Sequence, residues 1–121
     1  MQQADIEALV GVDLDRAIAQ ELGYKVAGQD DEFGLRIQRG MAYVPFSPSS
    51  DWTCFGPLMV EHRVALYPTM ARGVGAGQSG GVGWMGACEP GAPLVDRHAL
   101  TAGCRALLQR LVLNAKMRAA A

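Results

Sequence analysis

The sequence predicts an α+β fold, in which a small antiparallel sheet of three to four strands packs with an N-terminal helix and a long C-terminal helix. Apolar residues recur at helical spacing after Asp13 and again after Asp96, and short alternating segments lie between them. Glycine and proline residues separate these segments. With 121 residues, of which 50% are hydrophobic, the chain has the length and apolar content of one domain, 1–121.

The first predicted helix covers residues 13–23, and a short helical turn at 5–10 precedes it. Its apolar residues share one face: Leu14, Ala17, Ile18 and Leu22. We expect Asp13 to cap the free N–H groups at the helix start and Asp15 to interact with the positive end of the helix dipole. Gly23 is expected to end the helix in the left-handed conformation.

Short strands are predicted through the middle of the chain. Phe33, Leu35 and Ile37 alternate with small or polar residues, which is typical of a half-buried strand. A tight turn at 38–40 leads into the next strand, and residues 29–32 form an acidic turn. The other expected strands are Tyr24–Ala27, Met41–Val44, Val64–Tyr67 and Trp84–Ala87.

Two helical turns are expected between these strands. Ser50 or Asp51 can cap the first turn. Gly56 and Pro57 interrupt it, and Pro57 suits the first position of a second turn that ends at His62.

Glycine dominates the segment that precedes the last strand. The run at 72–83 can bury little surface and loses much entropy on ordering, so we interpret it as a flexible loop. Pro90 and Pro93 bound another loop. The long helix then runs from Asp96 to about Met117, with one apolar face and with the basic residues mostly off that face. The apolar residues are Leu100, Cys104, Leu107, Leu108, Leu111, Val112 and Ala115.

The net charge of −1 is the sum of two opposed parts. Residues 1–34 carry eight acidic and two basic residues, a net −6, whereas the rest carries four acidic and nine basic residues, a net +5. The near-neutral total argues against a protein that coats a polyanion. The division is compatible with an acidic face and a basic face on one molecule, with a basic surface that receives an anion, or with head-to-tail pairing of copies.

Membrane, secretion and metal signals are weak. No run of ~18 apolar residues predicts a transmembrane helix, and the first residues lack the order of a signal peptide. Three cysteines, Cys54, Cys88 and Cys104, are far apart and fit a reducing compartment. His62 and His98 have no ligand spacing with them, so we predict no metal site and no cofactor.

Catalytic patterns occur but lack their structural context. The glycine segment contains G-x-G-x-x-G at 75–80 and G-x-S-x-G at 77–81, yet neither opens a helix as a dinucleotide site or a nucleophile elbow requires. Glu61, His62 and Arg63 could supply an acid, a base and an anion clamp, but a polar junction between a helix and a strand is the favoured interpretation. We therefore do not expect an enzyme.

The two tryptophans are open to two interpretations. An exposed indole beside a loop and arginines can stack on a planar ring, whereas a buried indole fills the core. For Trp52 we favour core packing; for Trp84, which follows the glycine segment, both interpretations stand.

Three segments resemble the NinX-like family of small tailed-phage and prophage proteins. Residues 12–23 are similar to the opening helix of that family, L-x-x-x-V/I-A-x-x-x-G. Residues 46–52, FSPSSDW, with GPLMVE at 56–61 and VAL at 64–66, resemble its S-P-S-x-x-W, G-P-L-I-E and I-x-L core. WMGA at 84–87, Pro93-Leu94 and the helix around Arg105 resemble its W-x-A segment and closing helix.

The resemblance implies a phage accessory protein that acts in the host bacterial cytoplasm, and it does not imply an enzyme. Because polar loop motifs are more often functional than core residues, it also directs attention to particular residues. The candidate ligand-binding residues are Ser47, Ser50, Asp51, Trp52, Glu61, Arg63 and Trp84.

Three functions are compatible with these features. The first is a non-catalytic binder that sequesters a small anionic nucleotide signal of host defence, with the glycine loop as a lid. The second is an inhibitor or adaptor that docks its acidic N-terminal quarter on a host protein. The third is a nucleic-acid-binding module, which the scattered basic residues of the long helix disfavour. A homo-oligomer is expected for the first two, and no membrane partner is expected.

Overall fold

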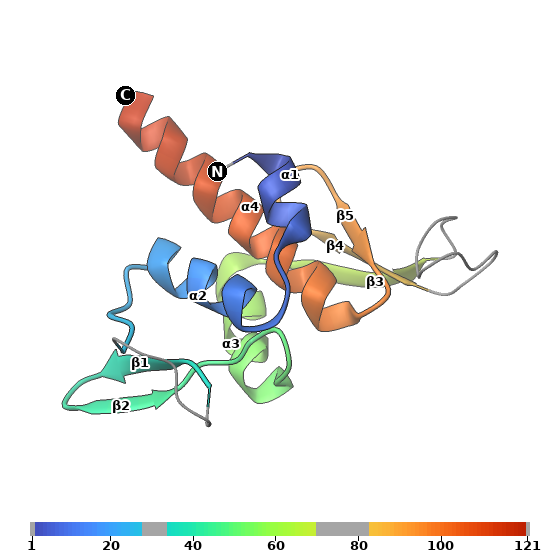
Figure 1. Cartoon of the computed structure of the whole chain (residues 1–121). Coiled ribbons are helices and arrows are strands. Elements are labelled where there is room, and N and C mark those ends of the chain that lie inside the picture. Colours follow the sequence, from blue (N-terminus) through green and yellow to red (C-terminus); the bar gives the residue numbers. More distant parts are fainter. Residues whose placement is uncertain (1, 28–33, 70–82, 121) are drawn as a thin grey trace.

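The computed structural model confirms an α+β fold (Figure 1). It describes residues 2–27, 34–69 and 83–120. The helices are α1 (Gln3–Ala8), α2 (Gly11–Glu21), α3 (Trp52–His62) and α4 (Ala99–Ala120), and the strands are β1 (Arg36–Arg39), β2 (Ala42–Pro45), β3 (Ala65–Thr69), β4 (Gly83–Ala87) and β5 (Leu94–Asp96). The strands form two antiparallel sheets, β1-β2 and β3-β4-β5, rather than one.

Helix α2 ends as expected but begins differently. Gly23 has a φ of +82°, which confirms the left-handed stop. The helix starts at Gly11 after the non-polar residue Val10, so the prediction that Asp13 is its N-cap was wrong. Gly11 has a φ of +56° and lets the chain turn from α1 into α2 two residues earlier. Asp13 lies in the first turn and pairs with Arg16 at 3.1 Å.

The β1-β2 sheet is a hairpin with a two-residue turn. Arg39 pairs with Ala42, so the turn consists of Gly40 and Met41 and not of residues 38–40. Gly40 supplies the positive φ, +61°, that this tight turn requires. The strand expected at 24–27 is reduced to a single bridge, between Val26 and Ile37.

Helix α3 is continuous, although two separate turns were expected. Asp51 is its N-cap, as predicted, and accepts a hydrogen bond from the Thr53 N–H at 2.9 Å. Pro57 lies inside the helix and removes one backbone donor. Both Pro57 and Thr53, the residue four positions earlier, are exposed, so water can solvate the carbonyl that loses its partner. Arg63 ends the helix in the left-handed region, with a φ of +56°.

The three-stranded sheet includes one strand, β5, that was not predicted from the sequence. β5 lies where a loop bounded by Pro90 and Pro93 was expected, and it pairs with β4 from Trp84↔Asp96 to Gly86↔Leu94. Gly86 faces α4 so closely that a Cβ there would lie 2.4 Å from the Ala102 carbonyl oxygen. A glycine is therefore needed at this position for the sheet to reach the helix.

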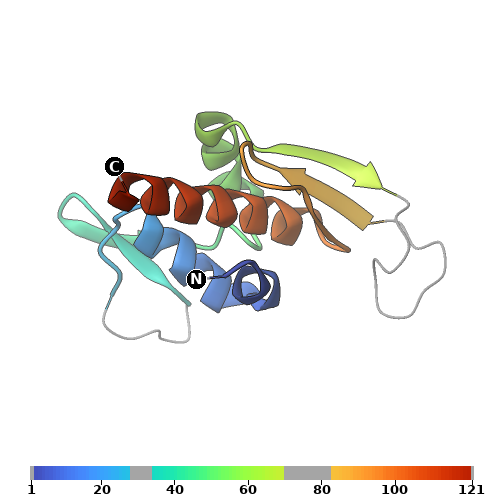
Figure 2. The same ribbon diagram turned by 90° about the horizontal axis from the view of Figure 1, so that it is seen from above.

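Helix α4 lies at the centre of the fold, as Figure 2 shows, with α1 and α2 on one side and α3 and the β3-β4-β5 sheet on another. Residues 102–109 are all buried, and the cysteines are free, with Cys88 and Cys104 buried and Cys54 half-buried. The expected single apolar face with the basic residues outside it was wrong for Arg105, which is 8% exposed. Neighbours on several sides enclose the middle of the helix, so no polar face remains there.

Two predictions lie outside the described residues: the acidic turn at 29–32 and the flexible loop, apart from Gly83, at 72–83. Within the described ranges, no helix has both the length and the hydrophobicity needed to cross a bilayer.

Candidate functional site

A cleft of about 890 Å³ opens where α2, α3, β4 and the start of α4 converge. Its volume is within the range of small-molecule sites. Each of these elements contributes residues to its wall. The lining residues are Gly11, Val12, Asp15, Gly34, Leu35, Pro45, Phe46, Ser47, Ser49, Ser50, Trp52, Trp84, Arg97, His98, Ala99, Leu100 and Thr101.

A serine turn forms one wall of the cleft. The Ser50 N–H donates to the Ser47 carbonyl at 3.1 Å, which closes the turn. Ser49 anchors it to α2, because its N–H and its Oγ donate to the Asp15 carboxylate at 2.8 and 3.0 Å. Asp15 is 2% exposed, and burial raises the pKa of its carboxyl above 3.8 against the opposing effect of the two Ser49 bonds. Asp15 lies beyond the first turn of α2, where the helix dipole has little effect, and its carboxylate holds the serine turn through Ser49.

The two tryptophans lie in different environments on the cleft wall. Trp52 begins α3 and is 52% exposed, so the expectation that it fills the core was wrong. Its ring meets Phe55 edge to face, with centroids 6.2 Å apart, and this contact fixes one edge of the indole. Trp84 is half-buried on β4, on the sheet face that Pro68 and Asp96 share.

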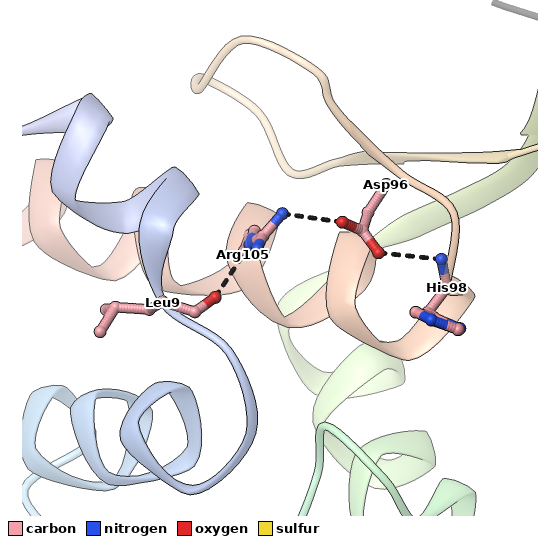
Figure 3. A network of polar contacts seen from close by, with 4 residues as sticks. All are labelled: Leu9, Asp96, His98 and Arg105. Carbon is pink, nitrogen blue, oxygen red and sulfur yellow. Dashed lines mark hydrogen bonds and ion pairs between the residues drawn. The ribbon is translucent and has the colours of Figure 1, made fainter. Parts of the chain in front are cut away.

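The start of α4 is held by a network of polar contacts (Figure 3). One oxygen of Asp96 accepts the His98 backbone N–H at 2.9 Å, and the other accepts Arg105 Nη1 at 3.0 Å. Arg105 Nε donates to the Leu9 carbonyl at 3.0 Å, which links the segment before α2 to the same network. The network fixes the backbone from which Arg97 and His98 enter the cleft wall, at the positive end of a 22-residue helix.

A comparison with family models relates the sequence to a known group of proteins. A family model described as "Bacteriophage P22, NinX" matches residues 5–110. The chain belongs to the phage NinX family. No curated protein matches the sequence significantly. The NinX match includes every residue that lines the cleft, and it supports a phage accessory protein.

Four of the seven predicted site residues of this NinX chain lie together on the cleft wall: Ser47, Ser50, Trp52 and Trp84. The other three do not line it. Asp51 caps α3, and Arg63 occupies the left-handed C-terminal position of the same helix. Glu61 lines a separate groove beside Tyr24 and Arg39. Helix α3 thus places Glu61 and Arg63 away from the cleft that its first residue, Trp52, lines.

Sequence reasoning missed the cleft residues of the NinX chain that come from α2 and from the segment directly before α4. Asp15 resembled an ordinary residue of a helix start, and Arg97 and His98 resembled the solvated first turn of the long helix. A signal was present in the charged and polar triplet Asp96-Arg97-His98 directly before an apolar helix, where an anion site can form.

Two arginines of α4 form hydrogen bonds within the NinX fold. Arg105 is held by Asp96 and Leu9, and Arg110 Nη1 donates to the His62 carbonyl at 3.1 Å. Neither guanidinium is therefore available to form a continuous basic face on the helix. Within residues 2–27, 34–69 and 83–120, no group of three His, Cys, Asp or Glu side chains could hold a metal ion.

Proposed function

We propose that this phage accessory protein binds a small anionic nucleotide in the cleft and sequesters it without chemical change in the host bacterial cytoplasm. The observation that carries the proposal is the meeting of Trp52 and Trp84 with Arg97 and His98 around one cleft. An exposed indole can stack on a base, and the arginine and the helix start favour a phosphate.

The neutral polar groups of the cleft support the same ligand class. Ser47, Ser50 and Thr101 add hydroxyl groups that can hydrogen-bond to phosphate or ribose oxygens. The one carboxylate among the described lining residues is Asp15, and it lies beneath Ser49, which donates to both of its oxygens. The two hydrogen bonds from Ser49 partly offset the negative charge that this carboxylate presents to an anion.

Sequestration is favoured over catalysis by the arrangement of the titratable groups. Asp15, Arg97 and His98 line the cleft, yet among the described residues no hydrogen bond joins the His98 imidazole to a cleft hydroxyl. A general base must reach the proton that it removes. The geometry therefore supports binding without a prepared nucleophile.

Calorimetric titration with a panel of linear and cyclic mono- and dinucleotides tests the binding. We expect heat with at least one member. Arg97→Ala should weaken the affinity about tenfold through loss of a charge-assisted contact, whereas Arg118→Ala, at the far end of α4, should leave it unchanged. Absence of heat for the whole panel would refute the proposal.

The fate of the nucleotide tests sequestration separately. The bound nucleotide, released by heating the complex, should be recovered intact and in stoichiometric amount on a chromatogram. Recovery of a product in place of the added nucleotide would show that the protein catalyses a reaction, and it would contradict sequestration.

A further inference from the structure

The charged side chains of the cleft nearly cancel one another. Among the described residues that line it, Arg97 is the one permanent cation and Asp15 is the one carboxylate. His98, beside Arg97, adds a positive charge only when its imidazole is protonated. Sites for nucleoside triphosphates, by contrast, combine lysine, arginine and Mg²⁺ around the phosphates. The side chains of this cleft therefore offer little net positive charge to a ligand with several negative charges.

The start of α4 adds a partial positive charge to the same wall. Residues 97–101 all line the cleft. The Ala102 N–H bonds back to the His98 carbonyl at 3.0 Å, whereas the N–H groups of the three residues before Ala102 have no acceptor within the helix. A helix start is equivalent to roughly half a positive charge. Together with the side chains, it allows the cleft to balance about one negative charge.

Asp15 sets this limit because its carboxylate is fixed in the cleft wall. The side chain is 2% exposed, and the N–H and Oγ of Ser49 hold its two oxygens at 2.8 and 3.0 Å. A buried charge is screened much less than an exposed one, so Asp15 repels an anion in the cleft in proportion to the charge of that anion. A phosphate with two negative charges is therefore repelled about twice as strongly as a phosphate with one.

We propose that the cleft selects nucleotides whose phosphate is a diester over nucleotides that end in a phosphomonoester or a polyphosphate. This selectivity rests on the nucleotide binding proposed above. A diester carries one negative charge, which Arg97 and the start of α4 can balance. A monoester carries about 1.5 to 2 negative charges near neutral pH, and Asp15 opposes the excess. Asp15 thus determines specificity without taking part in a reaction.

Nucleotides that share one base test the effect of phosphate charge. For the base that produces the most heat, we compare the 3′,5′-cyclic monophosphate, the 3′–5′ dinucleoside monophosphate and the 5′-monophosphate by calorimetry at pH 7.5. At least one of the two diesters should bind at least about tenfold more tightly than the 5′-monophosphate. The comparison of the two diesters shows whether the cleft takes one base or two. At pH 5.5 the preference should narrow, because the monoester then gains its second proton.

Asp15→Asn tests the residue to which the selectivity is assigned. The amide keeps the shape of the side chain and an oxygen for the Ser49 N–H, but it removes the negative charge. The preference for the diester should fall at least about threefold, mainly through tighter binding of the 5′-monophosphate. Asp13→Asn is the matched control, because Asp13 is an exposed carboxylate of the same helix that does not line the cleft. It should leave the preference unchanged.

The possible failures are distinguishable. If no nucleotide binds, the proposed function fails and the selectivity fails with it. If the 5′-monophosphate binds as tightly as both diesters, the cleft binds nucleotides but the selectivity is overturned. If a folded Asp15→Asn variant, checked by circular dichroism, keeps the full preference, the role assigned to Asp15 is wrong.

Discussion

Arg105, in the buried middle of α4, donates a hydrogen bond to Asp96 at the end of β5, and the two atoms are 3.0 Å apart. The same guanidinium reaches the carbonyl of Leu9. The segment before α2, the end of β5 and α4 are thus joined near the start of α4, beside Arg97 and His98 of the cleft wall (Figure 3).

Loss of the Asp96 side chain should lower the free energy of unfolding. Asp96→Ala leaves the guanidinium of Arg105, which is 8% exposed, without a counter-charge, and it also removes the acceptor of the His98 N–H. We expect a loss of about 2 kcal/mol in the free energy of unfolding, measured with urea.

Asp13→Ala is the matched control, because it removes an exposed aspartate that also pairs with an arginine. It should cost no more than about 0.5 kcal/mol. If both variants lose an equally small amount of unfolding free energy, the polar network at the start of α4 contributes little to the stability of the fold.

The contact between Gly86 and α4 gives a second prediction. Gly86→Ala introduces a Cβ that would lie 2.4 Å from the Ala102 carbonyl oxygen, so the strand or the helix must move. The free energy of unfolding should fall by about 2 kcal/mol. In Gly56→Ala the new Cβ meets nothing within 4 Å beyond its chain neighbours, but a Cβ before Pro57 is disfavoured in the helical conformation and offsets the higher helix propensity of alanine, so this variant should change the free energy of unfolding by less than about 1 kcal/mol. Thermal unfolding measures both, and a neutral Gly86→Ala would contradict the close packing.

The buried carboxyl of Asp15 gives a prediction for pH. Burial raises its pKa in the folded state, so the folded protein binds more protons than the unfolded chain above pH 3.8. The stability that this group contributes is present below pH 3.8 and is lost as the pH rises through the raised pKa.

Asp15→Asn keeps the shape of the side chain and removes the titration. The stability of the wild type relative to this variant should therefore decrease between pH 4 and pH 7, as urea unfolding at each pH can measure. A relative stability that increases with pH over this range would contradict the assigned direction.

The thiols should differ in reactivity. Burial raises the pKa of both Cys54 and Cys104, but Cys54 is half-buried whereas Cys104 is fully enclosed. A thiol reagent at pH 8 should label Cys54 slowly in the folded protein, and Cys88 and Cys104 only after unfolding. Mass spectrometry of peptides identifies the labelled sites, and rapid labelling of Cys104 would show that the α4 core opens readily.

Local signals predicted the ends of several elements. Gly23 stops α2, and Asp51 caps α3, because each acts on the backbone beside it. Pro57 does not interrupt α3 as predicted, because the effect of a proline on a helix depends on whether the carbonyl that loses its partner can reach water. The strand at 94–96 is short and follows a proline, so its pairing with β4 decides its structure rather than its own propensity.

Long-range contacts explain what the sequence could not show about the cleft. Asp15 and Ser49 are 34 residues apart, and Arg105 reaches a carbonyl 96 residues away. Neither pair has a local pattern, because burial comes from the packing of other elements around it. Trp52 was misassigned for the same reason: its neighbours in sequence are compatible with a core position, but it begins α3 at the edge of the cleft.

The most direct test of the binding proposal is the nuclear magnetic resonance spectrum of the two indole N–H groups during titration with nucleotides. Trp52 and Trp84 are the only tryptophans, and both line the cleft, so single Trp→Phe variants can assign the two signals. We predict that a nucleotide that produces heat shifts both signals with the same dissociation constant. Saturation with that nucleotide while both signals stay in place would contradict binding in the cleft.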